Sequence, residues 1–371
     1  MAAILSTLKP NTKLAWQITL PLVLILILAG GWTAYWFVAS TKAEEILDQV
    51  LAQQKAKGLT ITCADRSISG FPFKFLLSCT KLKIIRETPT RQTSLSASRL
   101  VFVVQAYNFN HMIGEIYGPF ELTRGRKRDA TGTVVETRKL FYGNAKTITS
   151  SLILKNRALK ETTLVVRGLS GTLLDYSLNN VPQKITTDLK ESVIHIRTTD
   201  DTSKPIGAYD AAGVVKGLSL VGGVANIRSE KGAQLEDFDV RMKITNAPYR
   251  ITGKLLDLLK IWKANDGKAT ITELNATSGG VKLKGSGQFK LDDLGRAQGV
   301  LKTKMTGLDG LINELVANGR LRQKDANMGL AAINILGNAG NGAVKVALRA
   351  QKGNVYFGPF KIAILKPLFK K

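Results

Sequence analysis

Few residues of this chain have the types and spacing that catalysis requires. The 371-residue sequence contains only two histidines, His111 and His195, to serve as the base that a hydrolytic nucleophile needs. His195 lies in Val-Ile-His-Ile-Arg, where strand alternation places it opposite the flanking isoleucines. His111 follows Asn-Phe-Asn and is expected in a loop. We read both as surface or hydrogen-bonded core imidazoles, and expect no catalytic residue and no enzymatic activity.

Motifs for metals and cofactors are also lacking. The sequence has no HExxH, Walker loop or Gly-x-Ser-x-Gly elbow. Gly285-Ser-Gly287 lacks the third glycine and the helix of a dinucleotide fingerprint, and reads as a pair of strand glycines. Asp292-Asp293 could bind a cation, but both residues precede Gly295 in a turn-like stretch where Asp is common. Without a CxxC pair or more histidines, no zinc site is expected, so we predict no metal and no cofactor.

Basic residues are the feature with functional meaning. Residues 124–128 concentrate four cations between two expected strands, and lysines interleave with apolar residues from Lys361 to the C-terminus. Such segments suit anionic membrane surfaces, where each cation contributes about 1 kcal/mol. The alternative is a solvated turn and a frayed tail. The predicted lipid-headgroup-binding residues are Arg124, Arg126, Lys127, Arg128, Lys366, Lys370 and Lys371.

An apolar segment near the N-terminus sets the compartment. Leu14–Ala39 contains no charge in 26 residues, which is long enough to span a membrane as a helix. Trp16 lies near one end, and Trp32, Tyr35 and Trp36 lie near the other, as in interfacial anchors. The run ends in bulky aromatics rather than a cleavage site, which favours an uncleaved anchor. A cleaved signal peptide or a buried soluble helix remain the alternatives.

Lysines flank the apolar segment on both sides, so the distribution of positive charge barely decides its orientation in the membrane. The short N-terminal tail favours insertion with the N-terminus inside and the C-terminus outside. We expect a single-pass inner-membrane protein with residues 1–13 as a short cytoplasmic tail, 14–39 as the anchor, 40–58 as a stalk helix and 59–371 exported to the periplasm. The only cysteines are Cys63 and Cys79. An even pair in an exported chain predicts a disulfide, and the alternative is two unpaired, small apolar side chains.

The charge of the exported portion points to polyanions. The whole chain carries +25, and only Lys9 and Lys13 precede the apolar segment, so the remainder carries +23. Such a field attracts nucleic acid, anionic lipid or acidic polysaccharide. An exported domain would seldom meet nucleic acid, so we expect no nucleic-acid partner and favour anionic lipid.

Hydrophobic periodicity predicts a mainly β fold with a few helices (α+β). In the stalk, Thr41-x-x-Glu44 fits a capping box and Gly58 a stop signal. We expect an N-terminal transmembrane helix followed by an antiparallel β-sheet domain with two possible subdomains divided near 198–206, or one long loop there. Expected strands cover 59–63, 73–85, 100–104, 116–123, 133–141, 146–155, 162–167, 192–197, 268–274, 281–284 and 344–349, and expected core-facing or sheet-capping helices cover 252–263, 308–318 and 326–336.

Several motifs resemble those of a family of Gram-negative envelope proteins known as domain of unknown function 2125. The resemblance rests on the anchor and stalk, the Ile68–Phe75 stretch with Gly70, Phe71, Pro72 and Phe73, Cys79, Gly118, Pro119 and Phe120, residues 285–295, and the helix at 308–318. The Gly-x-Gly-x-Phe-x-Leu-Asp style of 285–292 is also similar to AsmA-like envelope proteins. That likeness implies an elongated, curved β architecture and a role in lipid traffic or outer-membrane homeostasis. Neither family supplies catalytic residues.

The expected function is therefore a membrane-anchored periplasmic envelope protein. It would bind or move anionic lipid or lipopolysaccharide along an apolar sheet face. Two alternatives stay open: a scaffolding protein without a ligand, whose sheet is packed by the helices, and an enzyme acting on envelope polysaccharide, which would need converging carboxylates or histidines.

Overall fold

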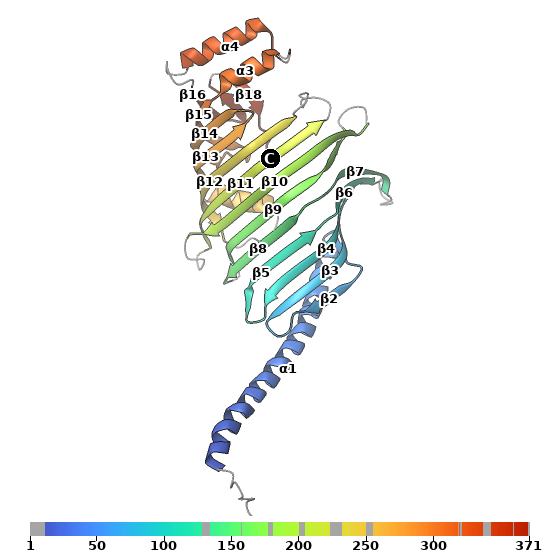
Figure 1. Cartoon of the computed structure of the whole chain (residues 1–371). Helices are drawn as coiled ribbons and strands as arrows, with labels where there is room; N and C mark the ends of the chain where they lie inside the picture. Colours follow the sequence, from blue (N-terminus) through green and yellow to red (C-terminus); the bar gives the residue numbers. More distant parts are fainter. Residues whose placement is uncertain are drawn as a thin grey trace, which may run out of the picture.

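The structure is a computed structural model that describes residues 12–127, 134–156, 158–176, 181–199, 205–222, 232–249, 255–317, 319, 321–336, 343–358 and 360–369. Over these residues the chain forms four helices and one large antiparallel sheet (Figure 1), which confirms the predicted mainly β class. Arg128, Lys370, Lys371 and most of the N-terminal tail, for which functions were predicted, lie outside the described residues.

The bounds of the elements are as follows. The helices are α1 (Thr12–Ala56), α2 (Leu255–Ala264), α3 (Leu308–Ala317) and α4 (Gln323–Leu336). The strands are β1 (Leu59–Thr62), β2 (Arg66–Ser69), β3 (Lys74–Glu87), β4 (Arg91–Gln105), β5 (Asn108–Tyr117), β6 (Phe120–Lys127), β7 (Val134–Asn144), β8 (Thr147–Lys155), β9 (Ala158–Asp175), β10 (Gln183–Thr198), β11 (Ile206–Gly222), β12 (Ala233–Pro248), β13 (Lys268–Ser278), β14 (Val281–Leu291), β15 (Ala297–Thr306), β16 (Val344–Gln351), β17 (Asn354–Phe357) and β18 (Phe360–Ile364).

The predicted anchor and stalk form one continuous 45-residue helix, α1. The capping box predicted at Thr41 is wrong, because its hydroxyl donates to the carbonyl of Phe37 (3.1 Å), a bond of the helix interior. α1 is long and apolar enough to cross a membrane, and Leu20 and residues 22–28 are more than half exposed. Its C-terminal part runs beside the sheet, where Asp48 pairs with Arg66 of β2 (2.7 Å).

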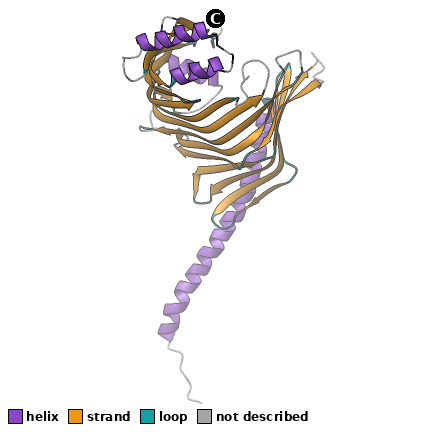
Figure 2. Cartoon of the chain, turned by 45° about the horizontal axis from the view of Figure 1, so that its top comes forward, coloured by secondary structure: helices purple, strands orange, loops and turns teal. Residues whose placement is uncertain are grey.

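The sheet is a long meander with a divided N-terminal part. From β9 to β18 each strand pairs with the next one in the chain. Before that, β1 and β2 share one side of β3, and two short columns of strands lie between β4 and β9. One column is β5 with β8 and the other is β6 with β7. Figure 2 shows the strands as one continuous layer from which α1 leaves at one end.

The structure contains the predicted disulfide and the three predicted helices that follow it in the chain. Cys63, immediately after β1, forms a disulfide with Cys79 of β3, across a Cα–Cα distance of 5.3 Å. The predicted helices correspond to α2, α3 and α4. α2 packs on β12, where the Trp262 indole donates to the carbonyl of Thr245 (2.8 Å). α3 and α4 pack on each other and contact β14 and β16.

The polar stretch proposed as a subdomain boundary joins two paired strands. β10 and β11 are neighbours from Thr198–Tyr209 to Ile185–Gly222. Residues on both sides of 198–206 therefore belong to the same sheet, although residues 200–204 themselves lie outside the described part.

Candidate functional site

An uncharged row of side chains crosses eleven strands of the sheet. Residues that are direct partners on neighbouring antiparallel strands point to the same face. Following the partners from β4 to β16 gives Leu100, Ile116, Ile148, Val166, Ser192, Val215, Phe238, Ala276, Leu283, Met305 and Val344. Ten of these eleven residues are apolar, so the row is a hydrophobic band perpendicular to the strands.

Two further rows extend this band along the strands. Residues two positions away share its face, except at the β-bulge of β13, where Leu274 and Ile271 are three positions apart, and neither row contains a charge. The second row is Phe102, Gly114, Ser150, Leu164, Ile194, Gly213, Val240, Leu274, Gly285, Thr303 and Val346, and the third is Val104, Met112, Leu152, Thr162, Ile196, Ala211, Met242, Ile271, Gly287, Leu301 and Leu348. We call these three rows the apolar face.

The middle of the apolar face is open. Leu164 and Ile194, direct partners on β9 and β10, are 39% and 47% exposed. The main contacts of the described helices with the sheet fall on β1, β12, β14 and β16, away from these strands. At the β14–β16 end the face is more closed, since Leu301 and Val344 are buried. The opposite face is mixed in polarity, as His195 between Ile194 and Ile196 illustrates.

Four arginines gather at one end of the strands. Arg91 of β4 is the direct partner of Arg126 of β6, and Arg124 is the direct partner of Arg138 of β7. Together with the acidic residues Glu136 and Asp175, they line a pocket of about 970 Å³. We call Arg91, Arg124, Arg126 and Arg138 the arginine cluster. It contains two of the predicted headgroup-binding residues.

The charges of the arginine cluster are incompletely balanced. Arg138 pairs with Glu136 (2.7 Å), and this hydrogen bond lowers the pKa of the Glu136 carboxyl. Among the described residues, Arg91, Arg124 and Arg126 form no ion pair. Like charges directly opposite each other on neighbouring strands repel, so an anion placed between the two pairs would stabilise them.

The arginine cluster continues the side of the sheet that carries the apolar face. Phe120, Leu122, Arg124 and Arg126 alternate along β6 and therefore share one side. Phe120 is buried in a cluster with Leu100, Ile116 and Ile148 of the apolar face. A ligand lying on the apolar face can thus reach the arginines without crossing the sheet.

The arginine cluster lies far from the anchor. β3 begins beside Trp36 of α1 at Lys74 and ends at Glu87, just before Arg91 begins β4. Fourteen residues at about 3.3 Å each separate its two ends by about 45 Å. The cluster therefore lies at the opposite end of β3 from the contact with Trp36 of α1.

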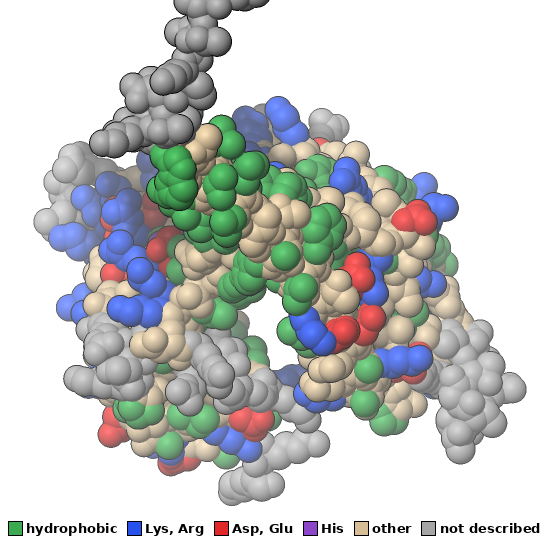
Figure 3. Space-filling model, turned by 90° about the horizontal axis from the view of Figure 1, so that it is seen from below, with side chains coloured by type: hydrophobic (Ala, Val, Ile, Leu, Met, Phe, Trp, Pro, Cys, Tyr) green, Lys and Arg blue, Asp and Glu red, His purple; other side chains and the backbone are tan. Residues whose placement is uncertain are grey.

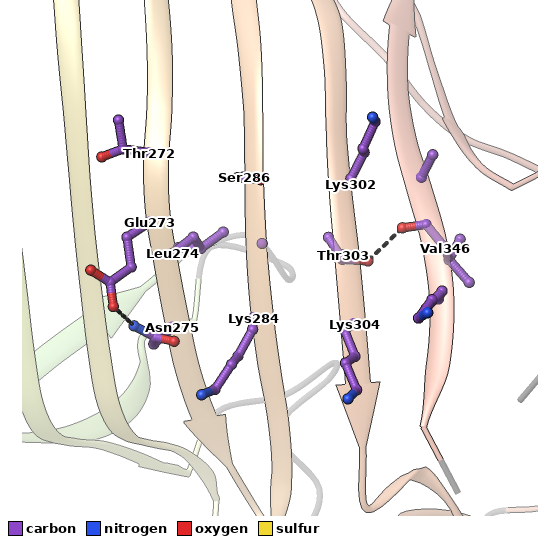
Figure 4. A pocket seen from close by; sticks show the side chains of 13 residues that line it. Thr272, Glu273, Leu274, Asn275, Lys284, Ser286, Lys302, Thr303, Lys304 and Val346 are labelled. Atoms are coloured by element: carbon purple, nitrogen blue, oxygen red, sulfur yellow. Dashed lines mark hydrogen bonds between the residues drawn. The ribbon is translucent and has the colours of Figure 1, made fainter. Parts of the chain in front are cut away.

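A second basic site was not predicted. Lys284, Lys304 and Lys345 are direct partners on β14, β15 and β16, and we call them the lysine row. With Lys302 they line a pocket of about 650 Å³ (Figure 4). These three strands contain no acidic residue. In the described part of the chain, the lysine row forms no ion pair. Since Lys284 alternates with Gly285 of the apolar face, the row points to the other side of the sheet.

The remaining predicted basic residues are less informative. Lys127 ends β6, and Lys366 is exposed in the segment after β18. Up to Phe369 this segment is held against the sheet and is not a frayed tail. The backbone N–H groups of Leu368 and Phe369 donate to the carbonyl of Leu294, and Phe369 is buried. The prediction that Lys127 and Lys366 bind headgroups stays a prediction.

The family motifs lie at corners of the sheet. Gly70, Phe71, Pro72 and Phe73 form the turn between β2 and β3, beside α1. Gly118, Pro119 and Phe120 connect the two strand columns. A Cβ at Gly118 would lie 2.0 Å from the Asn144 amide oxygen, which explains the glycine.

The residues first considered for catalysis have ordinary partners. His195 bonds Thr163 (2.8 Å) on the neighbouring strand. His111 was expected in a loop, but it lies in β5 and bonds Ser151 (3.2 Å), because pairing with β4 and β8 makes this polar stretch a strand.

Both carboxylates of the Asp292-Asp293 turn are paired with cations. Asp292 pairs with Arg296 and Asp293 with Lys263, each at 2.7 Å. The described residues contain no group of three potential metal ligands.

Comparison with known proteins gives a family but no activity. No curated protein and no solved structure matches the chain. One family model, described as an uncharacterised protein conserved in bacteria, matches residues 36–366, which include every described strand and the part of α1 from Trp36 onward. A match of this extent shows that the chain belongs to that family, domain of unknown function 2125.

Proposed function

We propose that this protein is a membrane-anchored envelope protein that binds or moves anionic lipid, including lipopolysaccharide, along its apolar face. In this proposal α1 spans the inner membrane with its N-terminus in the cytoplasm, and the sheet lies in the periplasm. Acyl chains lie on the apolar face and the arginine cluster holds the phosphates. No catalytic step is assigned to the chain.

The single observation that supports this most is the continuity of the apolar face. Three uncharged rows cross eleven strands, although 22% of the residues in the chain are charged. A soluble domain normally covers such a surface with a second layer, because large exposed apolar patches bind partners. An acyl chain is a suitable cover, since burial of each CH₂ contributes about 0.8 kcal/mol.

The shape of the molecule is compatible with a groove. Figure 3, which shows the molecule from below, has an opening near the centre of the molecule. We propose that the sheet curves around this space and that α3 and α4 cap its far end, as the likeness to AsmA-like proteins implies. In this arrangement the apolar face lines an elongated groove that leads away from the membrane.

The proposal is tested by native mass spectrometry of the full chain in mild detergent. We expect copurified anionic lipid with the natural sequence and its loss in the double variant Leu164→Glu/Ile194→Glu, because two carboxylates then lie in the middle of the apolar face. The matched control is Val165→Glu/Val193→Glu. These residues are also direct partners on β9 and β10 but point to the other side.

A second pair of variants tests the headgroup site. Arg124→Gln/Arg126→Gln should lower the share of anionic relative to zwitterionic lipid without removing all lipid. Lys155→Gln/Lys160→Gln, on exposed residues outside the arginine cluster, should leave that share unchanged. Absence of lipid from the natural sequence would refute the proposal.

A scaffolding role without a ligand is the second candidate. The observation that favours it is the contact of α3 and α4 with β14 and β16, beside the buried Val344. If the natural sequence carries no lipid, this second role is supported instead.

A further inference from the structure

The membrane helix is fixed to the sheet by an aromatic contact at the Gly70–Phe73 turn. The Trp32 indole donates to the carbonyl of Pro72 (2.9 Å), and the Trp36 indole donates to that of Lys74 (3.2 Å). Trp36 is buried and stacks on Phe75, with ring centroids 5.5 Å apart. These bonds fix the height of the turn relative to α1.

Four large aromatic side chains remain exposed at this end. They are Phe71 (49%), Phe73 (67%), Tyr107 (67%) and Phe109 (53%), and we call them the aromatic end. Phe71 and Phe73 lie in the turn between β2 and β3, Tyr107 lies in the connection between β4 and β5, and Phe109 lies at the start of β5. Figure 3, which views the molecule from this side, shows hydrophobic side chains gathered beside the helix. Water is an unfavourable environment for four such rings so close together.

The aromatic end lies beside the aromatic part of the apolar segment, which continues to Ala39. About 20 helical residues rise about 30 Å, the thickness of a hydrocarbon core, so a core that begins at Leu14 ends near Thr33, inside the aromatic part of the 26-residue apolar segment. Trp32, which bonds the turn, therefore lies at the membrane–water interface. A hollow of about 540 Å³ between the helix and the turn is lined by Ile25, Leu28, Phe71 and Phe73. Helix side chains at membrane depth and turn side chains thus face one space.

We propose that the aromatic end inserts into the lipid interface of the membrane that α1 spans, so that the sheet stands directly on the bilayer. Aromatic residues favour this depth, where their rings meet acyl chains and their polar atoms meet water. The inference rests on the anchor part of the proposed function, and does not require lipid on the apolar face.

This contact would also give the apolar face a membrane entrance. Phe75, stacked on Trp36, is the direct partner of Val104 in the third row. Phe109 stacks on Phe75 in turn (5.9 Å). The apolar face therefore begins at the side chains that lie against the membrane helix.

The test uses the full chain in nanodiscs of phosphatidylethanolamine and phosphatidylglycerol. A single environment-sensitive fluorophore is attached at Phe73→Cys or, in a second variant, at Tyr107→Cys, since Cys63 and Cys79 are joined and do not react. Lipids that carry a spin-label quencher near the headgroup should quench the fluorophore at position 73 or 107 at least about twofold more strongly than a fluorophore attached at Val181→Cys. Val181 is 56% exposed but lies at the opposite end of the strands.

A fluorophore at Leu24→Cys, quenched by spin labels at the bilayer centre, reports on the span itself. Quenching at position 24 together with values at 73 and 107 no higher than at 181 would overturn the inference and leave the anchor intact. Absence of quenching at position 24 would overturn both. Use of two aromatic positions guards against a variant that disturbs its own turn.

Discussion

Tyr249, just after β12, is the largest fully buried side chain among the described residues. This residue is fully buried, its hydroxyl accepts a hydrogen bond from the backbone N–H of Ala208 (3.1 Å), and its ring lies edge-on to Tyr209. A Cβ added at Gly207 would lie 1.8 Å from the Tyr249 hydroxyl oxygen. Because the ring is held on all sides, it cannot move to make room.

We therefore expect Gly207→Ala to lower the free energy of unfolding by about 1–3 kcal/mol, measured by urea denaturation in mild detergent. Gly310→Ala is the control, since a Cβ there meets nothing within 4 Å and the residue lies in helix α3. The control should be neutral or stabilising by up to about 1 kcal/mol. Equal stability of Gly207→Ala and the natural sequence would contradict the packing described.

The same cluster predicts a dependence of stability on alkaline pH. Burial, with a smaller contribution from Tyr249, raises the pKa of Tyr209 to about 12. The unfolded chain loses this proton near pH 10, so its contribution to stability is complete below about pH 10 and is lost as the pH rises to about 12.

Tyr209→Phe should remove this part of the pH dependence. At neutral pH it should cost about 1 kcal/mol, because the Tyr209 hydroxyl donates to the carbonyl of Pro248 (2.9 Å). Urea denaturation of both proteins between about pH 9 and pH 12 provides the measurement. If stability falls equally steeply in both, Tyr209 is not the group responsible.

At the scale of elements, the turn at 292–296 holds the C-terminal segment. Asp292 accepts hydrogen bonds from the backbone N–H groups of Leu294 and Arg296 and pairs with the Arg296 guanidinium. The carbonyl of Leu294 in turn accepts hydrogen bonds from the backbone N–H groups of Leu368 and Phe369. Burial alone would raise the pKa of Asp292, but these hydrogen bonds lower it below its ordinary value.

Asp292→Asn should therefore reduce stability by about 1–3 kcal/mol at neutral pH. Because the pKa is lowered in the folded state, this contribution is present above the ordinary value and is lost as the pH falls below about 4. The two proteins should thus converge in acid. Asp293→Asn is the control: its pair with Lys263 is exposed, so a change within about 1 kcal/mol is expected.

Helices were easier to predict than strands, for a physical reason. The stripe of Leu255, Leu258, Leu259 and Trp262 is set within one segment, and α2 follows it closely. Strands depend on their partners. Only 162–167 was predicted for β9, which extends from Ala158 to Asp175, because its charged and glycine positions break the local pattern while pairing on both sides maintains the strand.

The candidate sites divide in the same way. Arg124 and Arg126 are two positions apart in the sequence and were predicted, whereas Arg91 and Arg138 join them only through strand pairing. The apolar face depends on the register of eleven strands, and the lysine row depends on the register of three. Alternating lysines at 282–284 and 302–304 were a visible signal, but no single strand indicates that Lys284, Lys304 and Lys345 are opposite each other.

At the scale of the whole molecule, the sheet separates two kinds of binding surface. The apolar face and arginine cluster lie on one side and the lysine row on the other, so a polyanion on the lysine row would not compete with acyl chains. Adjacent strands are about 4.8 Å apart, and three unpaired ammonium groups at this spacing repel one another. Each would be stabilised by a bound phosphate.

We therefore predict that the triple variant Lys284→Glu/Lys304→Glu/Lys345→Glu binds inorganic polyphosphate at least about tenfold more weakly than the natural sequence, because charge attraction becomes repulsion. Isothermal titration calorimetry at low and high salt measures this, and the difference should shrink as salt screens the charges. Lys155→Glu/Lys160→Glu/Lys184→Glu is the control, with the same change in net charge on exposed lysines outside the row. Equal losses in both variants would mean that net charge alone governs binding. Copurified lipid should persist in both, because neither variant alters the apolar face.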